Sequence, residues 1–363
     1  MADLGTVPAV CIDASFWKDR RVFVTGHTGF KGGWLCLWLA RLGARVTGYA
    51  LEPPTEPSLF DAAGIAGDLT SVIADIRDRR RLDAALASAR PEIVFHLAAQ
   101  PLVRRAHADP VETFDTNVMG TVNLLDALRR QDGVLAAVVV TSDKVYDNRE
   151  WVWPYRETDR LGGSEPYGAS KACAEIAVDA FRHAYFADGP RIGVATARAG
   201  NVIGGGDWAE DRLVPDAIRA FAAGETLRLR NPLAHRPWQH VLEPLAGYVR
   251  LAECLTAAPE KTAGGWNFGP AGGDSRPVRW VADTIARLWG GDARWTLDNR
   301  ANPHEARLLA VDSSRAEAEL GWRPVWPVER ALEHTVAWYR AHYEGRDMRA
   351  LSIDQIEEYS DAA

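Results

Sequence analysis

Short apolar runs alternate with longer amphipathic stretches over the first 200 residues of the chain. The runs are rich in Val, Ile and Phe and are apolar at nearly every position, which is typical of strands that are buried on both faces. The longer stretches between them carry apolar residues at helical spacing. The pattern predicts strands at 22–25, 45–49, 93–97, 137–141 and 192–198, and helices at 33–42, 78–89, 111–130 and 164–186.

Strands that alternate with helices build βαβ units, and βαβ units build a parallel sheet. We therefore expect an α/β fold, a Rossmann-type doubly wound parallel sheet, over residues 16–200. After residue 200 glycine and proline become frequent between the remaining helical patterns. This change predicts a smaller mixed α/β domain over 201–345, with some of its segments returning to the sheet.

Five helices are predicted in that second part, at 213–223, 244–257, 278–288, 313–320 and 328–342. Residues 1–15 and 346–363 fall outside both domains. The last of these, from Arg346 to the end, is polar, so we expect a terminal extension that is poorly ordered.

The composition narrows the class of protein. The chain has 363 residues and a net charge of −7, which disfavours a nucleic acid or an anionic membrane as a partner. Four cysteines lie far apart, without a CxxC pair or a Cys/His cluster, so neither a disulfide scaffold nor a metal site is expected. No signal peptide or membrane-spanning segment is recognisable. These features indicate a cytoplasmic protein.

The sharpest local motif is the sequence VFVTGHTGFKG, in which a strand runs into three glycines and then a helix. Gly26 and Gly29 allow a tight turn close to a pyrophosphate, and Gly32 allows the helix to pack on the strand. The helix N-terminus favours an anion. We therefore expect a dinucleotide here, with Thr28, Phe30 and Lys31 completing the loop.

The sequence after the second predicted strand is a weaker indicator than the glycine motif, and it bears on whether the dinucleotide is NAD or NADP. An acid that binds the ribose is expected at its end, where the chain has Tyr49-Ala50-Leu51 and then Glu52. No arginine cluster is present for a 2′-phosphate, so NAD is favoured. Glu52 is either a ribose ligand or an ordinary exposed acid. Asp75 and Ile76 follow another short strand and are expected beside the adenine.

Two further motifs carry candidate chemistry. Tyr167 and Lys171 are four residues apart, so a helix places them on one face, and a nearby cation is expected to lower the pKa of the phenol. Ser142, Asp143 and Lys144 follow a strand, at the sheet edge where ligands bind. Either motif alone also occurs by chance or as a helix cap.

The order of these motifs resembles that of a known family. The glycine loop, His96-Leu97-Ala98-Ala99-Gln100, Asn117, Ser142-Asp143-Lys144 and the Tyr167/Lys171 pair resemble the extended short-chain dehydrogenase/reductases, and within them the nucleotide-sugar 4,6-dehydratases. The resemblance extends from about Phe16 to Tyr343. It implies NAD as the cofactor, bound also by residues Leu97, Ala98, Ala99, Gln100, Asn117, Tyr167 and Lys171.

The resemblance also implies roles for the catalytic residues. Tyr167 would take the proton of the sugar C4 hydroxyl while Ser142 binds that oxygen, and Lys171 would hold the ribose. Asp143 would donate a proton to the C6 hydroxyl that leaves. Lys144 would be the base at C5, or else a charged partner of Asp143. The stretches 26–34 and 141–148 favour CDP-glucose as the substrate.

The substrate side is expected to use residues that follow the predicted sheet. The candidates are Gln100, Asn201, Arg212, Val214, Arg236, His304 and Arg307. Arg236 suits a diphosphate, because a guanidinium binds it with two hydrogen bonds. Each of these is otherwise a residue of a surface loop or of an interdomain salt bridge. With Lys144 and Lys171, Arg236 predicts a positive crevice inside an acidic protein.

Three readings remain open. The first is dehydration of CDP-glucose, and the second is a dehydratase or a 4-epimerase that acts on a UDP-, dTDP- or GDP-linked sugar. The third is a regulator that binds NAD without catalysis. Asp143 argues against an epimerase, since loss of water needs an acid. A regulator has no need of Tyr167 and Lys171. The resemblance implies a homodimer or a tetramer.

Overall fold

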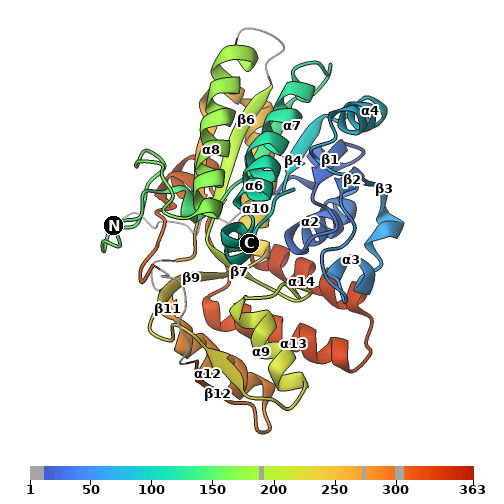
Figure 1. The fold of residues 1–363 in the computed structure, drawn as a ribbon. Helices are drawn as coiled ribbons and strands as arrows, with labels where there is room; N and C mark the ends of the chain where they lie inside the picture. Colours follow the sequence, from blue (N-terminus) through green and yellow to red (C-terminus); the bar gives the residue numbers. More distant parts are fainter. Residues whose placement is uncertain (1–11, 188–191, 272–274, 299–305) are drawn as a thin grey trace, which may run out of the picture.

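A seven-stranded parallel sheet forms the centre of the molecule (Figure 1). The computed structural model describes residues 12–187, 192–271, 275–298 and 306–363. The strands lie in the order β3-β2-β1-β4-β5-β6-β10. They comprise β1 (Arg21–Thr25), β2 (Arg45–Ala50), β3 (Leu69–Ile73), β4 (Ile93–His96), β5 (Ala136–Val140), β6 (Gly193–Ala199) and β10 (Gly264–Phe268).

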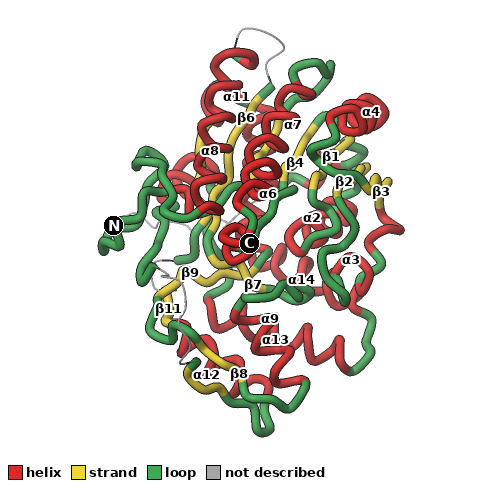
Figure 2. Tube along the Cα trace, in the orientation of Figure 1, coloured by secondary structure: helices red, strands yellow, loops and turns green. Residues whose placement is uncertain are grey.

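The strands are apolar throughout because both faces of the sheet are covered. Along β1, Val22 and Val24 belong to one hydrophobic core, while Phe23 between them belongs to another. Helices α2 (Phe30–Arg41) and α10 (Leu242–Ala257) contribute to the first core. Figure 2 shows helices around the strands, and the predicted doubly wound α/β class is confirmed.

The opposite face carries α4 (Arg79–Ala89), α7 (Gly120–Leu128) and α8 (Pro166–Phe181). The helix predicted at 111–130 is interrupted. Its place is taken by α6 (Pro110–Phe114), one wider π-helical turn (Asp115–Met119) and α7. Such turns often accompany functional positions.

The order of the strands fixes where a ligand can bind. The chain fills the sheet from β1 outward to β3, and then crosses over to place β4 on the other side of β1. In an open α/β sheet the crevice lies at such a switch point, outside the carboxyl ends of the strands. The segments after β1, β4 and β5 therefore meet at one edge.

The rest of the chain forms a smaller region beside that edge. It contains a three-stranded sheet, β11-β9-β7, and a two-stranded one, β12-β8. The chain also returns to the main sheet, where β10 pairs with β6 and α10 packs behind it. The domain boundary at residue 200 remains a prediction. The strands here are β7 (Asn201–Ile203), β8 (Leu227–Leu229), β9 (His235–His240), β11 (Ser275–Pro277) and β12 (Trp295–Leu297), and the longer helices are α9 (Leu213–Ala222), α12 (Val278–Trp289) and α13 (Val328–Tyr343).

The expectation of a poorly ordered tail is wrong. Residues Met348–Ala362 form α14, which packs against α2 and α13. Its buried side chains recur at helical spacing, but two of the five are polar, which hides the stripe from a hydropathy pattern; they are Met348, Ser352, Gln355, Ile356 and Tyr359. Tyr359 stacks edge-on against Trp38 of α2 and donates to Glu243 of α10 at 2.7 Å.

The remaining helices are short: α1 (Ala14–Trp17), α3 (Leu59–Ala62), α5 (Val103–Ala108) and α11 (Pro259–Thr262). Throughout the described part of the chain, every helix is too short or too polar to cross a membrane.

Candidate active site

The glycine motif forms a tight turn between β1 and α2. Gly26 has φ +77°, and a Cβ there would lie 2.7 Å from the backbone nitrogen of Ala98. A Cβ at Gly32 would lie 2.0 Å from the carbonyl oxygen of Gly26. Helix α2 starts at Phe30 after Gly29, with no side-chain cap and no acidic residue in its first turn. This cradle fits a diphosphate, because free N–H groups point at it.

Two threonine side chains, one at the end of β1 and one in the turn itself, hold the turn in place. The Thr28 hydroxyl donates to the Leu51 carbonyl at 2.8 Å. The Thr25 hydroxyl accepts from the backbone N–H groups of Leu97 and Ala98, both at 3.1 Å. The segment after β4 is thus fixed against the glycine turn.

Asn117 joins three elements at the inner wall of the crevice. Its side chain accepts from the Gln100 N–H at 2.8 Å and donates to the Gln100 carbonyl at 3.1 Å. It also donates to the Ser170 hydroxyl at 2.9 Å, which connects the loop after β4 to α8. The π-helical turn at Asp115–Met119 supplies Asn117. Its contacts are therefore structural ones within the wall.

Gln100, expected to contact both cofactor and substrate, uses its side chain within its own loop. Its oxygen accepts from the Leu102 N–H at 2.6 Å, and its amide nitrogen donates to the Thr113 hydroxyl at 2.9 Å. A ligand contact from this side chain stays a prediction. Ala99 lies beside it, half-buried, in the same segment.

The end of the crevice expected to bind adenosine is polar but mostly exposed. Glu52 lies just past β2 and is exposed. The Asp75 carboxylate pairs with Arg77 at 2.6 Å, and hydrogen bonds from Arg77 lower the pKa of Asp75. Ile76 is buried against Gly120. His27 bonds to the Ser71 hydroxyl at 2.8 Å, above the second strand.

The two catalytic motifs meet where β5 ends against the start of α8. Asp143–Val145 form a single 3-10 turn, capped by the Ser142 hydroxyl. Tyr167 and Lys171 lie on α8, which packs on that turn. The Lys171 ammonium donates to the Val140 carbonyl at 3.1 Å. The Lys144 ammonium lies 6.0 Å from the centre of the Tyr167 ring.

The expected effect of Lys171 on the phenol is wrong. Burial raises the pKa of Tyr167 to about 12. The influences that lower it are a hydrogen bond from Ser142 and the charge of Arg212, while Asp143 raises it. Lys171 is itself buried, and this burial lowers the pKa of Lys171 to about 8. The phenol is thus assisted by Ser142 and Arg212.

Asp143 is a buried acid with one open oxygen. Burial raises the pKa of its carboxyl, against the opposing charges of Lys144, Arg236 and Lys31. One oxygen accepts from the Ser142 hydroxyl at 3.1 Å. The other is buried without a hydrogen-bond partner. A protonated carboxyl with a free oxygen is suited to give a proton to a ligand.

The Lys31 side chain points to the inside of the site. Its ammonium donates to the Tyr248 hydroxyl of α10 at 3.5 Å. Burial and the charges of Arg212 and Lys171 lower the pKa of Lys31 to about 7, while the charge of Asp143 opposes this shift. Tyr248 was not expected here, since nothing in the local sequence distinguishes it from a core residue of α10.

The expected substrate residues lie on the smaller region, in different settings. Asn201 starts β7, opposite Trp238 of β9. Arg212 precedes α9 and pairs with Asp207 at 2.8 Å. Val214 is buried in α9, Arg236 lies on β9, Arg307 is exposed, and His304 falls outside the described residues. The charge of Arg212 acts on Tyr167 and the charge of Arg236 acts on Asp143, so these two arginines lie near the catalytic motifs. The contacts predicted for Asn201 and Arg307 stay predictions.

Sequence reasoning also missed a buried ion pair beneath the site. Arg198 of β6 and Glu175 of α8 are joined at 2.8 Å. The sequence did contain an indication that Glu175 lies near the site. Glu175 follows Lys171 by four residues and Tyr167 by eight, so the three share one face of the helix. In the described ranges, no group of His, Cys, Asp and Glu side chains is arranged to hold a metal ion.

Comparison with known proteins gives a consistent result. A family model described as "NAD dependent epimerase/dehydratase family" matches residues 22–263. A CDP-glucose 4,6-dehydratase from Salmonella typhimurium is 50% identical over 97% of this chain and 99% of that protein. A dTDP-glucose 4,6-dehydratase from Mycolicibacterium smegmatis is 31% identical over 89% of this chain and 94% of that protein.

A solved structure shares the fold. The dTDP-glucose 4,6-dehydratase DesIV from Streptomyces venezuelae, a double mutant with NAD bound, superposes with a TM-score of 0.76 at 24% identity. The match covers 90% of this chain and 98% of that chain.

Gly32→Ala should separate α2 from the glycine turn. The new methyl group would overlap the Gly26 carbonyl, so we expect a loss of about 3 kcal/mol in the free energy of unfolding. NAD binding should weaken about tenfold or more, because the N–H groups move away from the diphosphate. Gly67→Ala is the control, since a Cβ there meets nothing within 4 Å. Equal denaturant midpoints for the two variants would contradict the role of Gly32.

Proposed function

The chain belongs to the NAD dependent epimerase/dehydratase family, and we propose that it converts CDP-glucose to CDP-4-keto-6-deoxyglucose by 4,6-dehydration. The near full-length identity of 50% to a CDP-glucose 4,6-dehydratase supports the substrate. It is thus a hydro-lyase.

The cofactor is NAD, which when bound takes the hydride of C4 and later returns it to C6. The glycine turn and the N-terminus of α2 would hold its diphosphate. Thr28, Leu97 and Ala98 line that turn, and Lys171 would bind the ribose next to the nicotinamide. The tight turn that Gly26 and Gly32 permit, followed by an α2 N-terminus without a side-chain cap, is the feature that fits this group.

Oxidation at C4 requires that its hydroxyl lose a proton. Tyr167 takes this proton, and Ser142 donates a hydrogen bond to the same oxygen. The Ser142 hydrogen bond and the charge of Arg212 oppose the burial that raises the pKa of Tyr167. The C4 ketone that results makes the C5 hydrogen acidic.

Loss of water then uses two neighbouring side chains. Lys144 removes the C5 proton, and Asp143 gives its proton to the C6 hydroxyl, which leaves as water. When hydride reaches C6, Lys144 returns its proton to C5. Burial keeps Asp143 protonated to a higher pH than an exposed aspartate. Lys144 also neutralises Asp143 once the proton has gone.

The single observation that carries a dehydratase over an epimerase is the state of Asp143. It is buried, its pKa is raised, and one oxygen has no partner in the protein. An epimerase needs no acid at C6. A regulator that only binds NAD would gain nothing from this costly burial.

The smaller region would bind the nucleotide diphosphate. Arg236, Asn201 and Arg212 are the residues proposed for the diphosphate and sugar, and Val214, Arg307 and His304 are proposed as further substrate residues. The described cysteines, Cys36, Cys173 and Cys254, are free thiols. Free thiols persist in reducing compartments, which supports the cytoplasm as the location.

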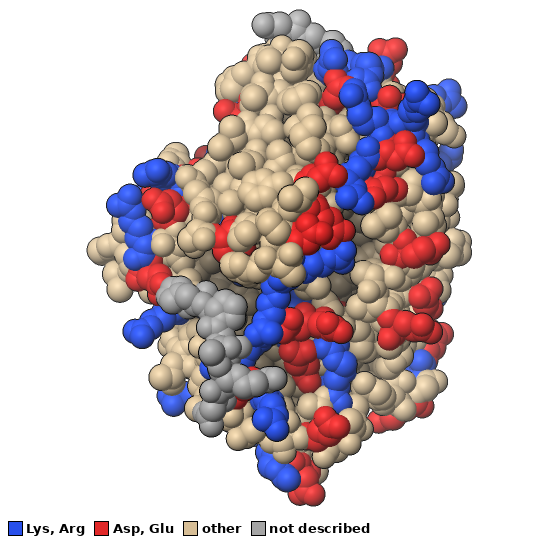
Figure 3. All heavy atoms as spheres, viewed as in Figure 1, with Lys and Arg blue, Asp and Glu red and all other residues tan. Residues whose placement is uncertain are grey.

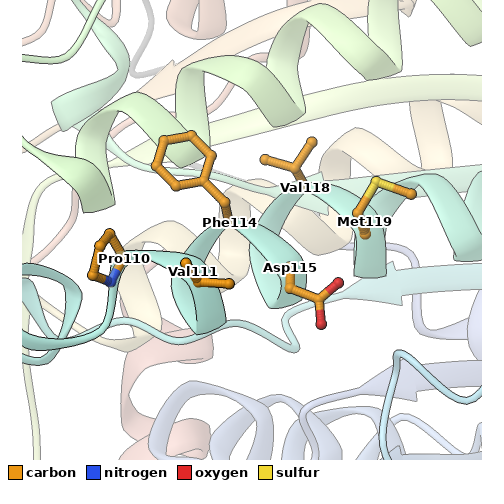
Figure 4. A pocket seen from close by; sticks show the side chains of 6 residues that line it. All are labelled: Pro110, Val111, Phe114, Asp115, Val118 and Met119. Atoms are coloured by element: carbon orange, nitrogen blue, oxygen red, sulfur yellow. The ribbon is translucent and has the colours of Figure 1, made fainter.

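We also propose a homodimer formed through α6 and α8. These helices pack side by side. Together with the π-helical turn after α6, they present exposed apolar side chains, namely Val111, Phe114, Met119 and Ile176. A hollow lies along α6 and the turn after it, and Figure 4 shows the side chains that line it. In Figure 3 the surface over α8 is mostly free of charge, while acids and bases mix elsewhere on this face.

Incubation of the protein and NAD with CDP-, dTDP-, GDP- and UDP-glucose tests the function. We expect the alkali-sensitive 4-keto product from CDP-glucose, at a kcat/KM at least about a hundredfold above the other three. Water loss is confirmed by the mass of the product. Activity confined to another nucleotide, or a C4 epimer as the product, would refute the assignment.

Asp143→Asn should stop the loss of water and leave NAD binding intact. We expect kcat to fall about 100- to 10,000-fold, since the amide cannot act as the acid. In the unmodified enzyme the rate falls as pH rises through the raised pKa of Asp143, because only the protonated form donates. This decrease of the rate with rising pH should be absent from Asp143→Asn. Asp147→Asn, in the same segment, is the control, and full turnover by Asp143→Asn would exclude the acid role.

Val111→Glu should convert the dimer to a monomer. The new carboxylate would be buried at the centre of the proposed interface without a partner. Light scattering coupled to gel filtration should give twice the mass of the chain for the unmodified protein and the single mass for the variant. Val152→Glu is a matched control, because both valines are 78% exposed. A dimer that survives Val111→Glu would place the interface elsewhere.

A further inference from the structure

A buried carboxylate lies directly beneath the catalytic residues and has no part in the proposed chemistry. Glu175 accepts hydrogen bonds from the Thr141 hydroxyl at 2.5 Å and the Thr196 hydroxyl at 2.6 Å. It also accepts two from the Arg198 guanidinium, at 2.9 and 2.8 Å. Both members of the ion pair are buried. A buried pair of this kind is costly to desolvate and is weak evidence for stability alone.

The position of Thr141 makes this contact relevant to the site. Thr141 lies between Val140, whose carbonyl accepts from Lys171, and Ser142, which starts the catalytic tripeptide. Glu175 therefore attaches α8 to β5 immediately beside both catalytic motifs. A shift of α8 along β5 would change the distance from Tyr167 to Ser142.

The ion pair extends to the far end of the tripeptide. Arg198 donates to the Tyr146 hydroxyl at 2.8 Å, and that hydroxyl donates to the Asn267 side chain at 2.7 Å. Tyr146 follows Lys144 by two residues. The segment that contains Asp143 and Lys144 is thus held from both of its ends by one buried network.

The charge of Glu175 also acts on Lys171. Burial lowers the pKa of Lys171 to about 8, and Glu175 is the group that opposes this shift. The other ionisable groups that face Lys171 are Tyr167 on its own helix, His96 at the end of β4 and Lys31 at the start of α2. Burial lowers the pKa of His96 to about 3, so it is neutral, while Lys31 disfavours a second ammonium nearby.

We propose that Glu175, paired with Arg198, is a positioning residue that aligns both catalytic segments and places a carboxylate on the face of α8 that carries Lys171, the residue proposed to bind the cofactor ribose. The inference rests on the proposed function, in which Lys171 holds that ribose. It predicts a pH dependence of NAD affinity that does not require turnover to be measured.

Glu175→Gln tests the electrostatic part. Without the carboxylate, Lys171 loses its proton at a lower pH, so the midpoint at which NAD affinity falls should move down by about one pH unit. Calorimetric titration with NAD between about pH 6 and 10 measures it. Asp179→Asn, one turn further along α8 and exposed, is the matched control and should keep the original midpoint. An unchanged midpoint in Glu175→Gln overturns the electrostatic role.

Glu175→Gln leaves the Arg198 charge buried without its partner, which destabilises the fold. The double variant Glu175→Gln with Arg198→Met buries no unpaired charge. Because a cation is removed together with the anion, its midpoint should move down by less than that of Glu175→Gln. If its midpoint moves down while the unmodified enzyme dehydrates no nucleotide sugar, the inference on Glu175 stands and the proposed function fails.

Thr141→Val tests the alignment separately. It keeps both charges and removes only the hydroxyl that joins Glu175 to β5. We expect kcat for dehydration to fall about tenfold or more, because α8 and the tripeptide after β5 are no longer held in their relative positions. The midpoint for NAD affinity and the thermal midpoint should change little. An unchanged kcat would overturn the alignment role.

Discussion

The contact between the end of β5 and the buried face of α8 is the constraint on which the rest of the site depends. Parallel strands end at one edge of the sheet, but a strand end alone does not orient a side chain. Here the Lys171 ammonium on the Val140 carbonyl and the Glu175 carboxylate on the Thr141 hydroxyl lock the helix to the strand. The tripeptide after β5 and the phenol of Tyr167 thereby acquire a fixed relation.

Burial around this contact shifts the pKa values of acids and of bases in opposite directions. It raises the pKa of Asp143, which favours the protonated form that an acid must have. It lowers the pKa of Lys31 to about 7 and of Lys171 to about 8. The same burial raises the pKa of Tyr167 to about 12, so the phenol needs Ser142 and Arg212 to act as a base. Burial therefore favours the protonated form of Asp143, while Tyr167 and Lys171 depend on neighbouring groups that oppose its effect.

Features that depend on local periodicity were predictable from the sequence. The strands, the glycine turn and the Tyr167/Lys171 spacing follow from residues close in the chain. The pKa of Tyr167 was predicted in the wrong direction. The Tyr167/Lys171 spacing indicates a neighbouring charge, but it does not indicate that the phenol is buried away from water. Tyr248 was missed because only the packing of α10 brings it to Lys31. Helix α14 was missed because its buried stripe includes Ser352 and Gln355.

Helix α14 shows how a remote segment fixes the wall of the site. Tyr359 packs on Trp38 of α2 and hydrogen-bonds Glu243 of α10, so α14 connects these two helices. The same two helices carry Lys31 and Tyr248, which meet at the catalytic end. Packed interiors transmit displacement and do not absorb it. The position of α14 therefore affects the geometry of the contact between Lys31 and Tyr248. The polar tail is therefore part of the scaffold that positions the glycine turn.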